Sequence, residues 1–257
     1  MAVAALRVVE HNATYYRRTW RGSVVLTFLS PVLFLAAMGL GLGGMIDRAA
    51  PGVLSGVSYA AFLAPGLLAA QAMNTGTFES TYPIMSRILW RRTYHAVLAT
   101  PLSVRDLLVG ELAWISLRLL MMAAAFLAVM LLFGVVRSPL VVLAVPAAVL
   151  TGLAFAACVT AFTATQTNDS GFSSLFRFVI TPLFLFSGTF FPIERLPELL
   201  RPVAYLTPLY HGVSLTRGLS LGTLDPTGAA IDAAVLAAYA VGGAVAARIT
   251  LGRALVK

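Results

Sequence analysis

The feature that most constrains this chain is a series of long apolar segments with very few charged residues. Six of them approach or exceed the roughly 20 residues that a helix needs to cross a bilayer core about 30 Å thick. Their apolar residues are continuous rather than alternating, which indicates helices rather than strands. The sequence therefore predicts an all-α integral membrane protein with six transmembrane helices. They are 24–45, 59–78, 112–136, 140–163, 172–191 and 229–247.

The composition excludes an ordinary soluble protein. Hydrophobic residues make up 59% of the chain and charged residues only 11%, whereas about one quarter of the residues in a soluble domain are charged. No stretch is polar enough to form a second, soluble domain. We therefore expect one transmembrane domain over 1–257, made of an interfacial arm (1–23), a six-helix bundle (24–247) and a cytoplasmic tail (248–257).

The arm before the first apolar segment is amphipathic. Apolar and aromatic residues recur in it at helical spacing, and arginines lie on or beside the opposite face, which is typical of a helix lying along a membrane surface. The apolar face comprises Leu6, Val9, Ala13, Tyr16 and Trp20, and the arginines are Arg7, Arg17, Arg18 and Arg21. An ordinary N-terminal anchor explains the same pattern.

The distribution of positive charge predicts the orientation, because short cytoplasmic loops are enriched in Arg and Lys. Eleven such residues lie on the side of the termini and five on the other side, so both termini are expected in the cytoplasm. The eleven are Arg7, Arg17, Arg18, Arg21, Arg87, Arg91, Arg92, Arg105, Arg248, Arg253 and Lys257, and the five are Arg48, Arg137, Arg195, Arg201 and Arg217. Topology and anionic lipids thus account for the net charge of +8, and no nucleic-acid partner is expected.

Two connections between the predicted helices are long. The cytoplasmic one, 79–111, has a centre at 88–98 that favours a short helix ending before Pro101. The external one, 192–228, is too apolar for a free loop. We expect it to form one or two short re-entrant helices, whose backbone must be covered by protein or line a cavity.

Several polar and aromatic residues fall within the predicted helices. Arg118 either shares a polar strip with Glu111 or extends its guanidinium to the headgroups. Gln71 and Asn74 lie on one helix face, which either lines a lumen or bonds to a neighbouring helix. The aromatic run before Pro192 is either lipid-facing bulk or a hydrophobic constriction at the outer end of a pathway. That run includes Phe186, Phe190 and Phe191.

Motifs for catalysis are absent from the sequence. The only lysine is Lys257, so the chain has no Walker A motif for ATP. It has no H-E-x-x-H or G-x-S-x-G motif, and the single Cys158 excludes a thiolate metal cluster. We therefore expect no catalytic, cofactor-binding or metal-ligating residue in this chain. The alternatives are an ion-coupled secondary transporter or channel, which needs paired intramembrane carboxylates or an inverted repeat, and, less favoured, a membrane lipid-modifying enzyme.

Three stretches resemble a known family. Residues 182–218 resemble ABC-2 type transporter permeases, in which the fifth helix ends in a Ser-Gly-x-x-Phe-Pro turn. Residues 72–80 and 91–112 are similar to the NodJ-like lipo-oligosaccharide export permeases and, more loosely, to the daunorubicin-resistance permeases. The residues that match the family turn and its continuation are Ser187, Gly188, Phe191, Pro192, Leu196, Pro197, Pro208 and Arg217.

The resemblance implies a multi-pass permease of the bacterial cytoplasmic membrane that exports an amphipathic substrate, such as a lipid-linked oligosaccharide, a glycolipid or a hydrophobic drug. It implies a homodimer with a second permease copy and two copies of a separate ABC ATPase, which binds ATP and Mg²⁺. A pathway is then expected between the permeases, lined by parts of helices 1, 2 and 5. Its candidate residues are Gln71, Asn74, Thr75, Phe186, Phe190 and Phe191, beside a re-entrant turn at Ser187, Gly188, Pro192 and Pro197.

The same resemblance gives the cytoplasmic segment 90–105 the role of a coupling element that contacts the ATPase. Apolar knobs and arginines are its expected contacts, although topology alone also explains the arginines. The candidate residues are Arg91, Arg92, Leu98, Pro101, Leu102 and Arg105.

Overall fold

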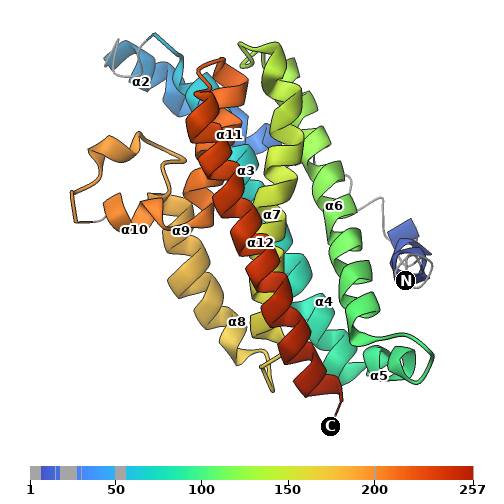
Figure 1. Cartoon of the computed structure of the whole chain (residues 1–257). Helices are drawn as coiled ribbons and strands as arrows, with labels where there is room; N and C mark the ends of the chain where they lie inside the picture. Colours follow the sequence, from blue (N-terminus) through green and yellow to red (C-terminus); the bar gives the residue numbers. More distant parts are fainter. Residues whose placement is uncertain are drawn as a thin grey trace.

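A computed structural model describes residues 7–14, 16–17, 28–29, 31–49, 56–199 and 201–256. Within these ranges the chain is helical and has no strand, which confirms the all-α prediction (Figure 1). The long helices run side by side, and the short helix α5 lies at the end of the bundle where the chain ends (Figure 1). We call this the C-terminal end of the bundle and the other the far end.

The chain passes through the following elements in order. They are η1 (Leu35–Leu42), α2 (Gly43–Ala49), α3 (Tyr59–Ser80), α4 (Tyr82–Met85), η2 (Ser86–Trp90), α5 (Thr93–Leu98), α6 (Val104–Leu132), η3 (Pro139–Leu143), α7 (Ala144–Thr163), α8 (Ser170–Leu175), η4 (Phe176–Ile180), α9 (Thr181–Phe186), η5 (Ile193–Arg195), α10 (Arg201–Tyr205), α11 (Pro208–Leu221) and α12 (Pro226–Leu255).

Three described helices are both long enough and apolar enough to cross a membrane, namely Val104–Leu132, Pro139–Thr163 and Pro226–Leu255. Shorter apolar helices span Pro31–Met45 and Ser170–Phe186. Helix α3 has 22 residues, but Gln71, Asn74 and Glu79 lower its hydropathy. The prediction of six spans therefore stays a prediction, and residues 24–27 and 30 of the first one lie outside the described part of the chain.

Three boundaries differ from those expected. Helix α6 begins at Val104 rather than near residue 112, because Ser103 accepts a hydrogen bond from the Asp106 N–H and Asp106 accepts one from the Ser103 N–H. The fifth apolar helix ends at Phe186, because the chain turns at Gly188 with φ +81°. Helix α12 continues to Leu255, so most of the expected tail is helical.

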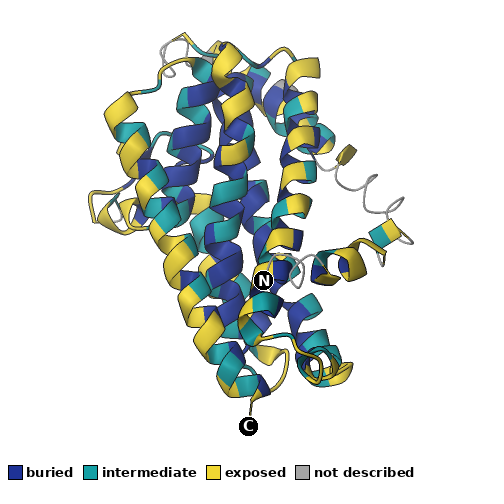
Figure 2. Cartoon of the chain, turned by 45° about the vertical axis from the view of Figure 1, so that its right-hand side comes forward, coloured by how far each residue is buried: buried dark blue, intermediate teal, exposed yellow. Residues whose placement is uncertain are grey.

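Helices α3 and α7 form the centre of the bundle, and the outer helices cover them (Figure 2). In the most apolar part of α7 61% of the residues are buried, against 17% in α12, so α12 presents an apolar outer surface. Glycines allow α3 and α7 to approach closely. A Cβ atom on Gly76 would lie 2.2 Å from the Gly152 oxygen, and one on Gly152 would lie 2.9 Å from the Ala72 oxygen.

The described part of the arm is helical and packs on α6. The side that packs on the protein is formed by Val8 and Asn12, and the Asn12 amide donates to Glu111 at 3.2 Å. Of the apolar face expected at the membrane, Val9 is half-buried and Ala13 is exposed. Of the expected arm residues, Leu6, Arg18, Trp20 and Arg21 lie outside the described residues, and contact with a membrane stays a prediction.

Candidate functional site

The expected coupling segment forms a compact unit at the C-terminal end of the bundle (Figure 1). The short helix expected at 88–98 is divided in two, because the chain turns at Arg92, which has a left-handed conformation with φ 51°. Helix η2 ends at Trp90, and α5 covers Thr93–Leu98 and ends before Pro101. A short turn through Pro101 then leads to Ser103, which caps α6. The turn at Arg92 and the capped start of α6 thus define the two ends of this segment.

The six candidate coupling residues share one surface segment. Leu98 is half-buried against the cluster of Ile88, Tyr94 and Leu107, and Leu102 is also half-buried. The other four are exposed, namely Arg91, Arg92, Pro101 and Arg105. Trp90, which the candidate residues did not include, exposes 59% of its surface beside them. An exposed tryptophan among arginines is typical of a protein-binding surface.

A buried charge cluster lies directly under this segment. Arg87 of η2 forms an ion pair with Glu111 of α6, and Asn12 of the arm donates to the same carboxylate. Burial alone would lower the pKa of Arg87, but Glu111 and Tyr94 raise it above its ordinary value. Burial, together with the Glu111 charge, raises the pKa of Tyr94 well above its ordinary value. Arg87 is therefore held charged and Tyr94 neutral.

A second ion pair connects α3 to α6. Arg118 lies 3.0 Å from Glu79, and its guanidinium also covers the ring of Tyr16 at 4.5 Å. Tyr16 in turn packs edge-on against Trp114. Arg118 and Glu111 therefore do not pair with each other, as a shared polar strip would suggest, because each has a partner on a different element.

The three polar pathway candidates lie on one face of α3. Gln71, Asn74 and Thr75 are all half-buried, and Phe78, one turn further, exposes 56% of its surface on the same face. The rest of α3 is almost entirely buried. The Asn74 amide donates to Ala70 of its own helix at 3.1 Å, so this bond does not join α3 to a neighbouring helix.

The three aromatic candidates are not brought together. Phe190 packs against Phe184 and Phe34, with ring centroids 5.0 and 6.4 Å away. Phe191 packs against the small cluster around Ile193, and Phe186 is exposed on the end of α9. The structure thus shows an aromatic cluster of Phe34, Phe184 and Phe190, in which Phe34 was missing from the candidates because it lies in a distant segment.

The helix α8–η4–α9 carries an exposed polar stripe that the candidates also missed. Arg177 is exposed about two turns from the start of this helix. Four hydroxyl residues occupy neighbouring turns of the same exposed stripe, namely Ser170, Ser173, Ser174 and Thr181. A stripe of this kind on an apolar helix is favoured facing water or protein and disfavoured facing lipid.

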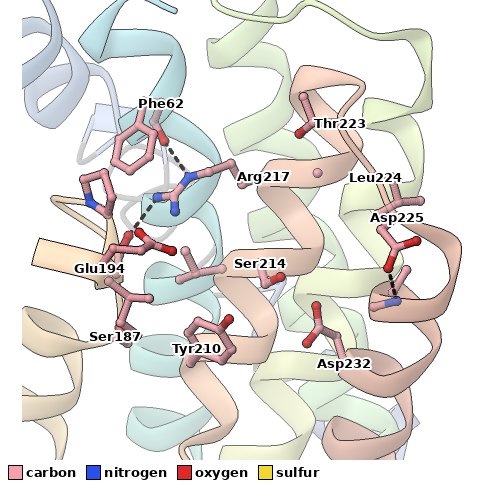
Figure 3. A pocket seen from close by; sticks show the side chains of 17 residues that line it. Phe62, Ser187, Glu194, Tyr210, Ser214, Arg217, Thr223, Leu224, Asp225 and Asp232 are labelled. Atoms are coloured by element: carbon pink, nitrogen blue, oxygen red, sulfur yellow. Dashed lines mark hydrogen bonds between the residues drawn. The ribbon is translucent and has the colours of Figure 1, made fainter. Parts of the chain in front are cut away.

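The expected re-entrant turn is held by Arg217 of α11. Its Nε donates to the Phe62 oxygen at 3.1 Å, and its Nη2 donates to the Gly188 oxygen at 2.9 Å (Figure 3). Nη2 also donates to the Thr189 oxygen at 3.2 Å. Gly66 permits this approach, because a Cβ there would lie 2.9 Å from Nη2. Ser187 and Gly188 are buried within the turn, Pro192 is half-buried and Pro197 is exposed.

A model of the ABC-2 type transporter family matches residues 10–221. The chain belongs to the ABC-2 type transporter family. Among curated proteins, Nodulation protein J of Rhizobium leguminosarum bv. viciae is 34% identical over 217 residues, which cover 84% of this chain and 82% of the relative. Nodulation protein J of Rhizobium meliloti (strain 1021) is 32% identical over 218 residues, which cover 85% and 81%. These relatives confirm the resemblance to NodJ-like proteins.

In this ABC-2 chain the matched region contains the coupling segment, the half-exposed face of α3 and the turn held by Arg217. The sequence supplies no Walker A motif. No group of three or more His, Cys, Asp or Glu residues that could hold a metal ion occurs within the described ranges.

Proposed function

We propose that this chain is the permease subunit of an ABC exporter, and that it moves an amphipathic substrate outward with energy from a separate ATPase subunit. The observation that carries the proposal is the family match over residues 10–221 in a chain without its own ATP-binding motif. Such a division of labour requires a surface that receives motion from the ATPase. The exposed segment around Trp90 and Arg92 supports that role.

The substrate that we propose is a lipid-linked oligosaccharide or glycolipid, with a hydrophobic drug as the alternative cargo. Its headgroup would follow the half-exposed face of α3 and the polar stripe of α8–η4–α9, while its apolar tail stays in lipid. Two copies of the chain would enclose this path, since an exposed Arg177 is unfavourable against hydrocarbon. The relatives are named for nodulation. The hydroxyl groups of a lipid-linked saccharide can form hydrogen bonds with the polar side chains of both faces.

The geometry gives no support to an ion-coupled transporter. The described buried carboxylates, Glu111 and Asp232, both face a basic partner, and Glu79 pairs with Arg118. A cation pathway needs carboxylates that are free to bind and release an ion. We propose both termini in the cytoplasm, which places the coupling segment on the ATPase side.

Co-purification tests the proposed assembly. The tagged permease is expressed with a candidate ABC ATPase from the same genome and extracted in mild detergent. The mass of the complex is then measured by native mass spectrometry. We expect two permeases and two ATPases in one complex, and loss of the ATPase with Leu102→Asp but not with Arg195→Glu at the other end of the bundle. A monomeric permease that retains no ATPase under any extraction condition would contradict the proposal.

A further inference from the structure

A cavity of ≈ 340 Å³ with mixed polar and apolar walls lies beside α11 (Figure 3). Its walls come from α3, from α11, from the beginning of α12 and from the turn at 187–194. Charged and hydroxyl residues line it together with two aromatic rings, Phe62 and Tyr210. Its volume falls in the range of about 300–1,000 Å³ that is usual for small-ligand sites.

Arg217 supplies oriented donors to this cavity. Its Nε and Nη2 groups are occupied by the carbonyls of Phe62, Gly188 and Thr189, and its guanidinium stacks on the Phe62 ring at 3.8 Å. A guanidinium has five N–H donors. The two of Nη1 have no partner among the described residues, although the carbonyl bonds fix their direction.

Acidic groups supply the acceptors. Asp225 uses Oδ2 to accept from the Gly228 N–H at 2.7 Å, and Asp232 uses Oδ1 to contact His211. Each therefore keeps one carboxylate oxygen without a partner in the described part of the chain. Glu194 has an exposed side chain that lines the same cavity, and Figure 3 shows it beside the Arg217 guanidinium. Ser187, Ser214 and Thr223 add hydroxyl groups.

This combination selects against two classes of ligand. An apolar group would remove water from the Arg217 donors and the carboxylates without replacing their hydrogen bonds, which is costly. A phosphate would meet three carboxylates for one arginine. A polyhydroxylated group satisfies both sets, because each hydroxyl donates and accepts, while its C–H face can pack on the half-buried Tyr210.

We propose that this cavity is a binding site for a saccharide headgroup, at the end of the bundle where an exported substrate would leave. The inference rests on the proposed function, since it chooses a sugar headgroup over an apolar drug as the exported polar group. It also adds a site that lies within one copy of the chain, apart from the path between copies.

Binding to the full chain tests this site without an ATPase. The permease is placed in nanodiscs of phosphatidylethanolamine and phosphatidylglycerol, and saturation-transfer NMR is recorded with cellobiose, sn-glycerol 3-phosphate and hexanol. Two variants alter the cavity. Ser214→Leu fills it, and Glu194→Gln changes an exposed side chain that folding does not require. Glu198→Gln, on the same external segment but outside the cavity, is the matched control.

We expect cellobiose to bind the unaltered chain and the Glu198→Gln control equally. Binding should weaken roughly fivefold in Glu194→Gln, because a neutral acceptor replaces a charged one in the hydrogen bond to the sugar, and it should disappear in Ser214→Leu. No cellobiose signal above that of empty nanodiscs, tighter binding of glycerol phosphate or hexanol, or undiminished cellobiose binding in Glu194→Gln would overturn the proposal. If the permease still co-purifies with its ATPase, such a result contradicts the saccharide site but not the proposed function. The failure of one proposal can therefore be told from the failure of the other.

Discussion

The Nδ1 atom of His211 lies 2.7 Å from the Asp232 carboxylate and joins α11 to α12. The other ring nitrogen, Nε2, faces the Tyr205 oxygen at 2.9 Å. Both ring nitrogens therefore have an oxygen partner, one on α12 and one in the segment before α11. Both residues are buried. The sequence did not indicate this pair, because the two residues lie 21 positions apart on different helices.

Replacing Asp232 tests whether this pair holds α11 in place. Asp232→Ala leaves a buried imidazole without its partner and should destabilise the chain by about 2–3 kcal/mol. Asp232→Asn retains a hydrogen-bonding oxygen and should cost clearly less. Thermal unfolding of the purified chain in detergent measures both. Equal melting temperatures for the unaltered chain and Asp232→Ala would show that the pair does not stabilise the fold.

The close approach of α3 and α7 makes a second prediction. Gly76→Ala places a methyl group 2.2 Å from the Gly152 oxygen, so the helices must separate, at a cost of about 1–3 kcal/mol. Gly242→Ala is the control, because nothing lies within 4 Å of its Cβ position and Ala favours a helix. We expect a lower melting temperature for the first variant only. A similar response of both variants would exclude close packing as the cause.

The ion pair of Arg118 with Glu79 predicts rescue by exchange. Each single reversal, Arg118→Glu or Glu79→Arg, places like charges about 3 Å apart and should destabilise the chain. The double exchange should recover part of that loss, with a coupling energy of roughly 0.5–3 kcal/mol. Melting temperatures of the four chains complete the cycle. An additive result would mean that the two residues do not interact, and that other contacts, including the one with Tyr16, stabilise Arg118.

The helical class and the position of most long helices followed from the sequence, because apolar runs of about 20 residues have few alternatives. The start of α6 could also have been found, since Ser103 and Asp106 form a recognisable capping pair. The partners of Arg118 and Asp232 could not, because helical periodicity gives the face of a residue but not the register between distant helices. The turn at Gly188 was suggested by the family resemblance rather than by hydropathy.

Within the candidate site, the sequence placed Gln71, Asn74 and Thr75 on one face, since their spacing alone decides this. It could not foresee that Phe190 packs against Phe34, because that contact depends on how the first apolar helix lies against α9. Whether the α3 face lines a pathway remains a prediction.

The coupling segment makes a functional prediction. Leu102→Asp and Arg92→Glu should leave the permease folded but lower substrate-stimulated ATP hydrolysis in the complex to about the level of the ATPase alone. Arg195→Glu, an exposed charge change elsewhere in the chain, is the control and should retain stimulation. Hydrolysis is measured in proteoliposomes with and without a glycolipid. Normal stimulation in both coupling variants would exclude this segment as the route of coupling.

The central claim is ATP-driven export by this chain with a separate ATPase, and transport into inside-out vesicles tests it most directly. Vesicles containing both subunits receive a fluorescent lipid-linked oligosaccharide on their outer face, and its movement to the inner leaflet is followed by quenching. We predict movement that requires ATP and stops when the ATPase carries a substituted Walker A lysine. Movement that continues without the ATPase, or that follows an ion gradient instead of ATP, would contradict the claim.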